Sequence, residues 1–241
     1  MKNKDIACLA FLLSIFSLSL SGDWRKSYLP EIERTGFSTT FNEIQEVGPA
    51  GDSYVELKNP GKIVFRNSVK DQVHYVRITL KPGVETDISK NPVVEVSGAR
   101  LGFKLIREPD VSVVTVAVAD QDGYWQDTNI FFRADQQEYP ETWMDFTLRI
   151  DPIAGVFDLF HEKRLWAVDI PLTKDSTESS LDLKSLRSSF VKRVEISGGN
   201  PLFSDRDKNG VPDDFEKKFI NAPGNSGLTL KEAYIETNGR F

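Results

Sequence analysis

Alternating apolar and polar residues run through the middle of this chain. An example is segment 73–80, which puts Tyr75, Arg77 and Thr79 on one face of an extended strand and Val76, Ile78 and Leu80 on the other. A period of two residues is typical of a half-buried strand, because successive side chains point to opposite sides of a sheet. We therefore expect a strand with its first face in water and its second face in a core.

Turn-forming residues interrupt the chain at regular intervals. Gly-Pro, Asn-Pro-Gly, Pro-Gly and Asp-Gly steps occur at residues 48–49, 59–61, 82–83 and 122–123. Short segments rich in β-branched and aromatic residues lie between such steps, which is typical of an all-β sandwich or barrel. Segment 111–118 is apolar at nearly every position, so it predicts a central strand covered on both sides.

Three strands joined by two short turns are predicted after Trp143. The strands are expected at 146–150, 156–160 and 165–168, with turns at 151–155 and 161–164. With a closing strand at 190–196, this meander resembles the late part of the concanavalin A-like (laminin G-like) jelly-roll superfamily. The resemblance covers residues 41–199 and implies an antiparallel jelly-roll sandwich, a fold that includes lectin-like binding modules as well as glycoside hydrolases and lyases.

Changes in composition mark the ends of this β region. Residues 174–189 are rich in Ser, Thr and charge, so we expect a loop with one helical turn near 181–186. A Gly-Gly-Asn-Pro step at 198–201 then indicates a boundary. The chain divides into a leader at 1–22, a mostly β sandwich at 23–199 and a small α-helical module at 200–241.

The leader has the features of a secretory signal peptide. Lys2 and Lys4 precede an apolar run at 8–20, which ends in small residues. The run is shorter than the roughly 20 residues that span a membrane. We expect cleavage after residue 21 or 22, no membrane span afterwards, and a secreted, periplasmic or cell-surface protein; an uncleaved membrane anchor is the alternative.

Charge and cysteine content narrow the partners and the sources of stability. The formal charge is −6 and the sequence pI is about 5.1. No Lys/Arg-rich run occurs, which argues against nucleic acid as a partner. Cys8, the one cysteine, lies in the leader, so the mature chain has no thiol for a disulfide.

One stretch specifies a chemistry by residue type and spacing together. Residues 205–216 read DRDKNGVPDDFE, and Gly210 falls where a twelve-residue calcium loop bends sharply. Calcium takes six to eight oxygen ligands. The ligand positions hold Asp205, Asp207, Asn209, Val211 through its carbonyl, Asp213 and Glu216. An acidic solvated turn is the plainer alternative, but every diagnostic position matches, so we predict one Ca²⁺ site.

Helix signals follow this loop. Phe215 and Phe219 lie four residues apart on one face of a predicted helix over 213–220, and Thr229 with Glu232 forms a capping box for a second helix. The second loop, near 222–227, lacks acidic ligands, so we expect a structural partner whose Tyr234 and Ile235 pack on Phe215 and Phe219.

This tail resembles a bacterial EF-hand, also described as a thrombospondin type 3-like module, with Pro212 in its expected place and Asn209 where Asp is more usual. Such units often end secreted proteins. The resemblance implies one extracellular calcium ion, bound at about 10⁻⁴–10⁻³ M.

The β region carries no comparably sharp catalytic pattern. A retaining glucanase of this superfamily would carry two glutamates and an aspartate on one strand face, about 5–5.5 Å apart. The nearest candidates, Glu138 and Glu141, have the wrong spacing, and His74 and His161 are far apart, with His74 expected to be packed. We predict no catalytic residues; the alternative is a polysaccharide-active enzyme, a glycoside hydrolase or lyase.

Aromatic residues offer a binding surface instead. Tyr124, Trp125, Tyr139 and Trp143 surround predicted loops, and Trp and Tyr faces stack on pyranose rings. Core packing is the plainer interpretation for each of them. The sequence therefore predicts an exported calcium-binding protein with a binding or adhesion domain, whose partner is an extracellular polysaccharide or a cell-surface protein.

Overall fold

The computed structural model describes residues 25–28, 37–39, 43–47, 54–58, 60–65, 72–173, 179–221 and 228–237. The predicted leader at 1–22 and the predicted second loop at 222–227 lie outside these residues.

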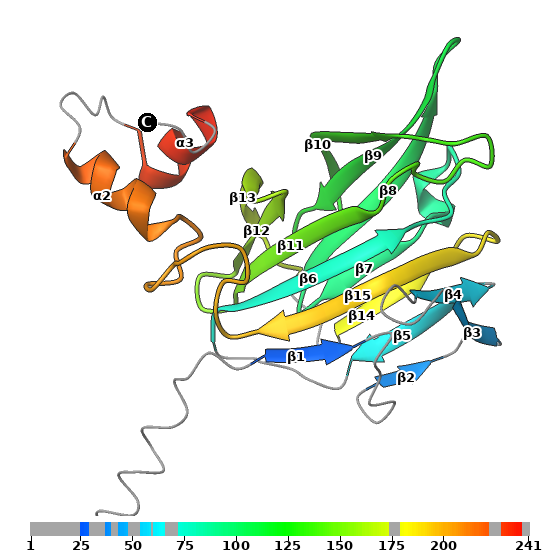
Figure 1. The fold of residues 1–241 in the computed structure, drawn as a ribbon, viewed down its shortest axis with the longest axis horizontal. Coiled ribbons are helices and arrows are strands. Elements are labelled where there is room, and N and C mark those ends of the chain that lie inside the picture. Colours follow the sequence, from blue (N-terminus) through cyan, green and yellow to red (C-terminus); the bar gives the residue numbers. More distant parts are fainter. Residues whose placement is uncertain are drawn as a thin grey trace, which may run out of the picture.

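Two antiparallel sheets build the molecule, and α2 and α3 lie together at one end beside β12 and β13 (Figure 1). We call the eight-stranded sheet the first sheet. Its order is β13 (Arg164–Pro171), β12 (Val156–His161), β11 (Met144–Asp151), β6 (His74–Lys81), β15 (Ser189–Ser197), β4 (Tyr54–Lys58) and β3 (Glu43–Val47), and β1 (Arg25–Tyr28) also pairs with β15.

The second sheet has seven strands, and a 3-10 helix, η2 (Ile88–Lys90), precedes β7 in the chain. Its order is β10 (Trp125–Arg133), β9 (Ser112–Ala119), β8 (Ala99–Arg107), β7 (Val93–Val96), β14 (Ser179–Leu183), β5 (Gly61–Phe65) and β2 (Phe37–Thr39). Apolar residues from the inner faces of both sheets form one core between them. The predicted mostly β, antiparallel sandwich is confirmed.

The predicted meander is confirmed in its register. Leu148 of β11 pairs with Leu159 of β12, and Leu159 pairs with Ala167 of β13. The alternation predicted for β6 also holds, because Val76, Ile78 and Leu80 are buried in the core. The closing strand is β15, which lies between β6 and β4.

Three expectations were wrong in part. Strand β14 forms where a loop with a helical turn was expected, because Leu181 and Leu183 alternate with Ser180 and Asp182 and fit between β5 and β7. Strand β9 is an interior strand between β10 and β8, as expected, but Val113 and Thr115 on its outer face are only half-buried. The face of β6 that was expected in water is covered at Tyr75, which is 0% exposed.

A second, smaller core joins the C-terminal helices to the sandwich. Helix α2 (Asp213–Asn221) and helix α3 (Leu230–Glu236) enclose Phe215 and Tyr234, whose rings meet edge to face at 4.9 Å between centroids. Phe160 of β12 and Leu165 of β13 belong to the same cluster. Thr229 and Glu232 form the predicted capping box at the start of α3. The helices therefore pack on the sandwich and on each other.

Candidate functional site

The loop predicted to bind calcium folds around the carboxylate of Asp205. Asp205 Oδ1 accepts a hydrogen bond from the backbone N–H of Asn209 at 3.1 Å, and Oδ2 accepts one from that of Gly210 at 3.0 Å. Gly210 has a φ of +90°, a conformation that an L side chain resists. The sharp bend therefore forms at the predicted position, held by the first residue of the loop.

Asp205 also ties the loop to the first sheet. The hydroxyl of Tyr75 donates to Asp205 Oδ2 at 2.6 Å, and Asn200 Nδ2 donates to the same oxygen at 3.2 Å. Burial raises the pKa of Asp205 above its usual range, although these hydrogen bonds act in the opposite direction. Burial also raises the pKa of Tyr75, and the nearby Asp205 charge adds to this, so Tyr75 stays a neutral donor.

Three other predicted ligands meet one another. Asn209 Nδ2 donates to Asp207 Oδ2 at 2.9 Å and also contacts Glu216 Oε1. The Asn209 side-chain oxygen accepts from the N–H of Val211 at 2.8 Å. The twelfth position of the loop thus lies beside the third and the fifth, as a loop that closes around one ion requires.

Asp213 has a different place. Its Oδ1 accepts from the N–H of Arg206 at 3.0 Å and its Oδ2 accepts from Ser204 Oγ at 2.6 Å. The hydrogen bond from Ser204 lowers the pKa of Asp213. In the structure Asp213 therefore joins the two ends of the loop and is not part of the group around Asn209.

The donors near Asn209 have the chemistry that a hard cation takes. The carboxylates of Asp207 and Glu216 meet at the NH₂ group of Asn209, whose amide oxygen accepts from the N–H of Val211. Carboxylate and amide oxygens are ligands that Ca²⁺ prefers, and the Asn209 amide would turn to offer its oxygen to an ion. Among the described residues, no group of three or more His, Cys, Asp or Glu side chains is placed to hold a metal ion. A calcium site in this loop would therefore need the Asn209 amide oxygen and a backbone carbonyl oxygen as well as the carboxylates.

The bend of the loop presses against the outer face of the first sheet. A Cβ added at Gly210 would lie 3.0 Å from Asp158 Oδ2 and 3.1 Å from Arg149 Cδ. Arg149 Nε donates to the backbone oxygen of Lys208 at 2.5 Å. Lys208 has a positive φ of 59°, a conformation that is uncommon for residues other than glycine. The loop is therefore fitted to the strand beneath it.

A buried ion cluster lies beneath the loop. Asp158 is 0% exposed, and its Oδ2 receives Arg149 Nη1 at 3.2 Å and Lys231 Nζ at 2.9 Å. Lys231 belongs to α3 and also contacts Asp169 of β13 at 2.6 Å, while Arg149 contacts Asp151 at 3.0 Å. Two cations and three carboxylates from the sandwich and from α3 thus share one network.

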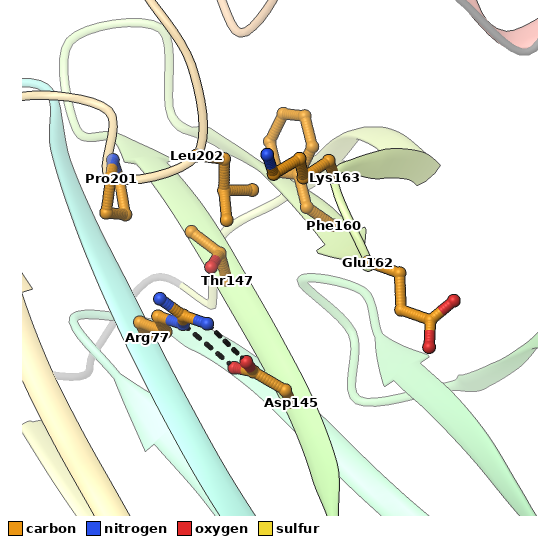
Figure 2. A pocket seen from close by; sticks show the side chains of 8 residues that line it. All are labelled: Arg77, Asp145, Thr147, Phe160, Glu162, Lys163, Pro201 and Leu202. Atoms are coloured by element: carbon orange, nitrogen blue, oxygen red, sulfur yellow. Dashed lines mark hydrogen bonds and ion pairs between the residues drawn. The ribbon is translucent and has the colours of Figure 1, made fainter.

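A cavity of about 350 Å³ opens beside this junction (Figure 2). Its lining comes from β6, from β11, from the turn after β12 and from the segment that leads to the loop: Arg77, Asp145, Thr147, Phe160, Glu162, Lys163, Pro201 and Leu202. Figure 2 shows the Arg77 guanidinium facing the Asp145 carboxylate, with donor–acceptor distances of 3.0 and 2.5 Å. The sandwich and the C-terminal module both contribute walls.

The four predicted aromatic ligand residues do not form one surface. Trp125 begins β10, the edge strand of the second sheet, and its ring lies against Gly102 of β8, where an added Cβ would come within 2.7 Å of Cζ3. Arg100 lies with its Cζ 5.4 Å from the centre of the same ring. Tyr124, the preceding residue, is 72% exposed. This pair therefore marks the outer face of the second sheet.

The other two aromatic residues lie on the first sheet's side. Trp143 packs on Tyr54 at 5.4 Å between ring centroids, and Tyr139 packs on Phe190 at the same distance. Tyr54 and Phe190 also meet each other edge to face. Lys81 places its Nζ 5.7 Å from the Trp143 ring centre. Tyr139 and Trp143 therefore belong to a packed aromatic cluster.

The acidic and histidine candidates for catalysis have structural contacts. Glu138 pairs with Arg107 and with Arg187. The His74 ring contacts the oxygen of Gln72 at 2.9 Å, and burial lowers its pKa. His161 Nδ1 lies 2.9 Å from the backbone carbonyl oxygen of Asp145. Glu141 is exposed.

A second pair of carboxylates lies across the outer face of the first sheet. Glu195 pairs in register with Arg77, and Asp145 lies on the far side of the same strand. Neighbouring strands are about 4.8 Å apart, so the backbones of these two residues are at least about 10 Å apart. The arginine between them pairs with Asp145, which differs from the close carboxylate pair of a retaining glycosidase.

Several residues at the junction were not identified from the sequence. Tyr75 lies on the face of β6 that was expected in water, Arg149 and Asp158 lie on β11 and β12, and Lys231 lies near the start of α3. One signal was available, because Arg149 and Asp158 fall on the same register row once the β11–β12 turn is fixed. No local sequence pattern predicts that the C-terminal module packs against Arg149 and Asp158.

Comparisons with known proteins give no family. No family model matches the chain, and no curated protein matches it. No helix among the described residues is long and apolar enough to cross a membrane.

Known structures share the general architecture at low similarity. The botulinum neurotoxin serotype D binding domain has 12% identity and a TM-score of 0.39, covering 66% of this chain and 43% of that one. Domain 4 of AbnA, a GH43 extracellular arabinanase from Geobacillus stearothermophilus in complex with arabinotriose, has 12% identity and a TM-score of 0.41, covering 67% and 81%.

Lectin I-B4 from Griffonia simplicifolia, in its metal-free form, has 8% identity and a TM-score of 0.33, covering 72% of this chain and 98% of the lectin. The chain thus spans less than half of the neurotoxin domain but nearly the whole lectin.

If the loop at 205–216 is docked on the sheet, replacing Gly210 should destabilise the protein more than replacing Gly155. Gly155 also has a positive φ, 70°, but an added Cβ there would meet nothing within 4 Å. Gly155→Ala should lower the free energy of unfolding by about 1 kcal/mol through backbone strain alone. Gly210→Ala should cost about 1–3 kcal/mol more, because it also crowds Asp158 and Arg149. Urea unfolding of both variants measures this, and equal losses would contradict a docked loop.

Proposed function

We propose that this protein is an exported, non-catalytic binding protein, in which a β-sandwich binds glycan and a C-terminal loop binds one Ca²⁺. The observation that carries the calcium part is the meeting of Asp207, Asn209 and Glu216 at a bend held by Asp205. Six ligand positions with calcium-loop spacing support the same proposal.

Within the loop, Asp207, Asn209 and Glu216 would hold the ion, with Asp205 and the Val211 carbonyl completing the set and Asp213 acting directly or through water. A bound Ca²⁺ supplies positive charge that offsets the repulsion among these carboxylates. The chain's own contribution is to keep the loop bent and docked. Calcium binding is therefore proposed as structural, and it stabilises the position of α2 and α3 on the sandwich.

Isothermal titration of the mature protein with CaCl₂ tests this proposal. The wild type should bind one ion at about 10⁻⁴–10⁻³ M. Glu216→Gln should weaken binding by about tenfold or more, because it removes the ligand that supplies two oxygens. Asp214→Asn is the matched control: its carboxylate lies in the same turn, is 92% exposed and occupies no ligand position. Equal affinity in wild type and Glu216→Gln would refute the site.

The glycan part is carried by Trp125. Its ring lies on Gly102 of β8 on the outer face of the second sheet and is partly buried, with Tyr124 and Asp127 exposed nearby. An aromatic face beside polar groups suits a pyranose ring, which has an apolar C–H face and hydroxyl edges. Tyr139 and Trp143, by contrast, contact other aromatic rings of the first sheet, so we assign the surface to Tyr124 and Trp125.

Binding to a panel of neutral polysaccharides, measured by affinity electrophoresis, tests this assignment. Trp125→Ala should weaken binding more than about tenfold, or ~1.4 kcal/mol. Trp143→Ala removes an indole of the same size from the other sheet and should leave affinity unchanged. Loss in both variants, or in neither, contradicts the assignment. New reducing ends after incubation with wild type would favour the alternative, a glycoside hydrolase or lyase.

Export is proposed from the N-terminal sequence, which joins a basic start to a short apolar run. Expression of the full chain in a bacterium with a Sec pathway should yield exported protein that begins at Gly22 or Asp23. N-terminal sequencing of that product measures the cleavage position. Retention of the intact chain in the membrane fraction would support an uncleaved anchor instead.

A further inference from the structure

The cavity beside the module has a fixed polar wall. Arg77 Nε and Nη2 donate to the two oxygens of Asp145, and Thr79 Oγ1 lies 3.4 Å from Oδ1. These hydrogen bonds raise the pKa of Arg77 and hold both side chains in one arrangement. The pair is not sealed off, since the two side chains are 24% and 35% exposed. A guanidinium has five N–H donors, so the pair presents fixed donors and acceptors to the cavity.

The charges around the cavity cancel. Arg77 and Lys163 contribute two positive charges, and Asp145 and Glu162 contribute two negative charges. Figure 2 shows Arg77 and Asp145 turned toward each other, while Glu162 extends away from them. An anion would meet an arginine that is already paired, and a cation would have to compete with that arginine for Asp145. The lining therefore suits a ligand that has no net charge.

Three apolar residues also line the cavity, and two of them come from the module. Pro201 and Leu202 lie on the segment between β15 and the loop, and Phe160 lies in the core shared by the sandwich and the helices. A ligand here would meet hydrogen-bonding groups on one side and C–H surface on the other. The volume of about 350 Å³ lies within the range of about 300–1,000 Å³ that is usual for small-molecule sites.

We propose that this cavity is a second binding site, which takes one neutral sugar residue. Its hydroxyls would bond to Arg77 and Asp145, and its C–H face would rest on Leu202 and Pro201. This inference takes its class of ligand from the proposed glycan-binding function. The cavity lies on the first sheet, whereas Trp125 lies on the second. Because Pro201 and Leu202 form a wall, the site is complete only while the module is docked on the sandwich.

Saturation-transfer NMR on the mature protein, with methyl glucopyranoside, methyl galactopyranoside and methyl mannopyranoside as probes, tests this site. Methyl glucuronide is the charged counterpart. At least one neutral probe should give a signal that the Trp125→Ala variant retains. Asp145→Asn keeps the size of the side chain but removes its charge and one acceptor, and it should weaken binding of that probe about tenfold or more.

In the Trp125→Ala background, Leu202→Trp fills the cavity and should abolish the signal that remains. Circular dichroism shows that each variant is folded, as does polysaccharide binding where Trp125 is present. No signal with any neutral probe, or a signal that survives both Asp145→Asn and Leu202→Trp, would overturn the site. A signal lost only in Trp125→Ala would also overturn it while leaving the proposed function intact. Stronger binding of the glucuronide would overturn the neutral class of ligand.

Discussion

The carboxylate of Asp158 is closed off from water, and the placement of the C-terminal helices depends on it. A buried charge is costly unless it is paired and hydrogen-bonded. Asp158 receives Arg149 from the neighbouring strand, the backbone N–H of Asp169, and Lys231 from α3. One of its two cations thus comes from a helix at the far end of the chain. Without that helix, the sandwich would keep a buried anion with a single cationic partner.

This requirement explains why the loop is docked on the sheet. The bend at Gly210 covers Asp158 and Arg149, and the carbonyl of Lys208 accepts from Arg149. Asp205, the first residue of the loop, binds the buried hydroxyl of Tyr75. The loop therefore uses part of its backbone and one carboxylate for docking, while Asp207 and Glu216 gather around Asn209. A metal ion bound by this loop would therefore be coupled to the stability of the sheet beneath it.

The regular parts of the fold could be predicted because their signals are local. The meander from β11 to β13 follows from strict alternation and two short turns, and the start of α3 follows from Thr229 and Glu232. The position of the bend at Gly210 also followed from spacing. Strand β14 had the same alternation at Leu181 and Leu183, but the polar residues around them obscured it.

The remaining features depend on contacts between distant segments. Tyr75 and Arg149 have polar atoms on alternating strands, which predicts a wet face unless something covers it. The loop at 205–216 covers this face, although it lies about 60 to 130 residues further along the chain. No local sequence pattern predicts that this loop packs against these strands. The same holds for the cavity, whose lining residues Arg77 and Leu202 are 125 residues apart in the sequence. The division of the four aromatic residues between two sheets likewise depends on topology.

The central claim is that a calcium-loaded loop stabilises the sandwich on which it is docked. Thermal unfolding of the mature protein, followed by tryptophan fluorescence with increasing CaCl₂, tests it most directly. Trp125, Trp143 and Trp166 lie in the sandwich and no tryptophan lies in the module, so their signal follows the unfolding of the sandwich. We predict a melting temperature that rises with calcium, by an amount equivalent to about 2.7 kcal/mol at a hundredfold excess over Kd, and no rise in Glu216→Gln. A tryptophan transition that is unaffected by calcium in the wild type would contradict the account.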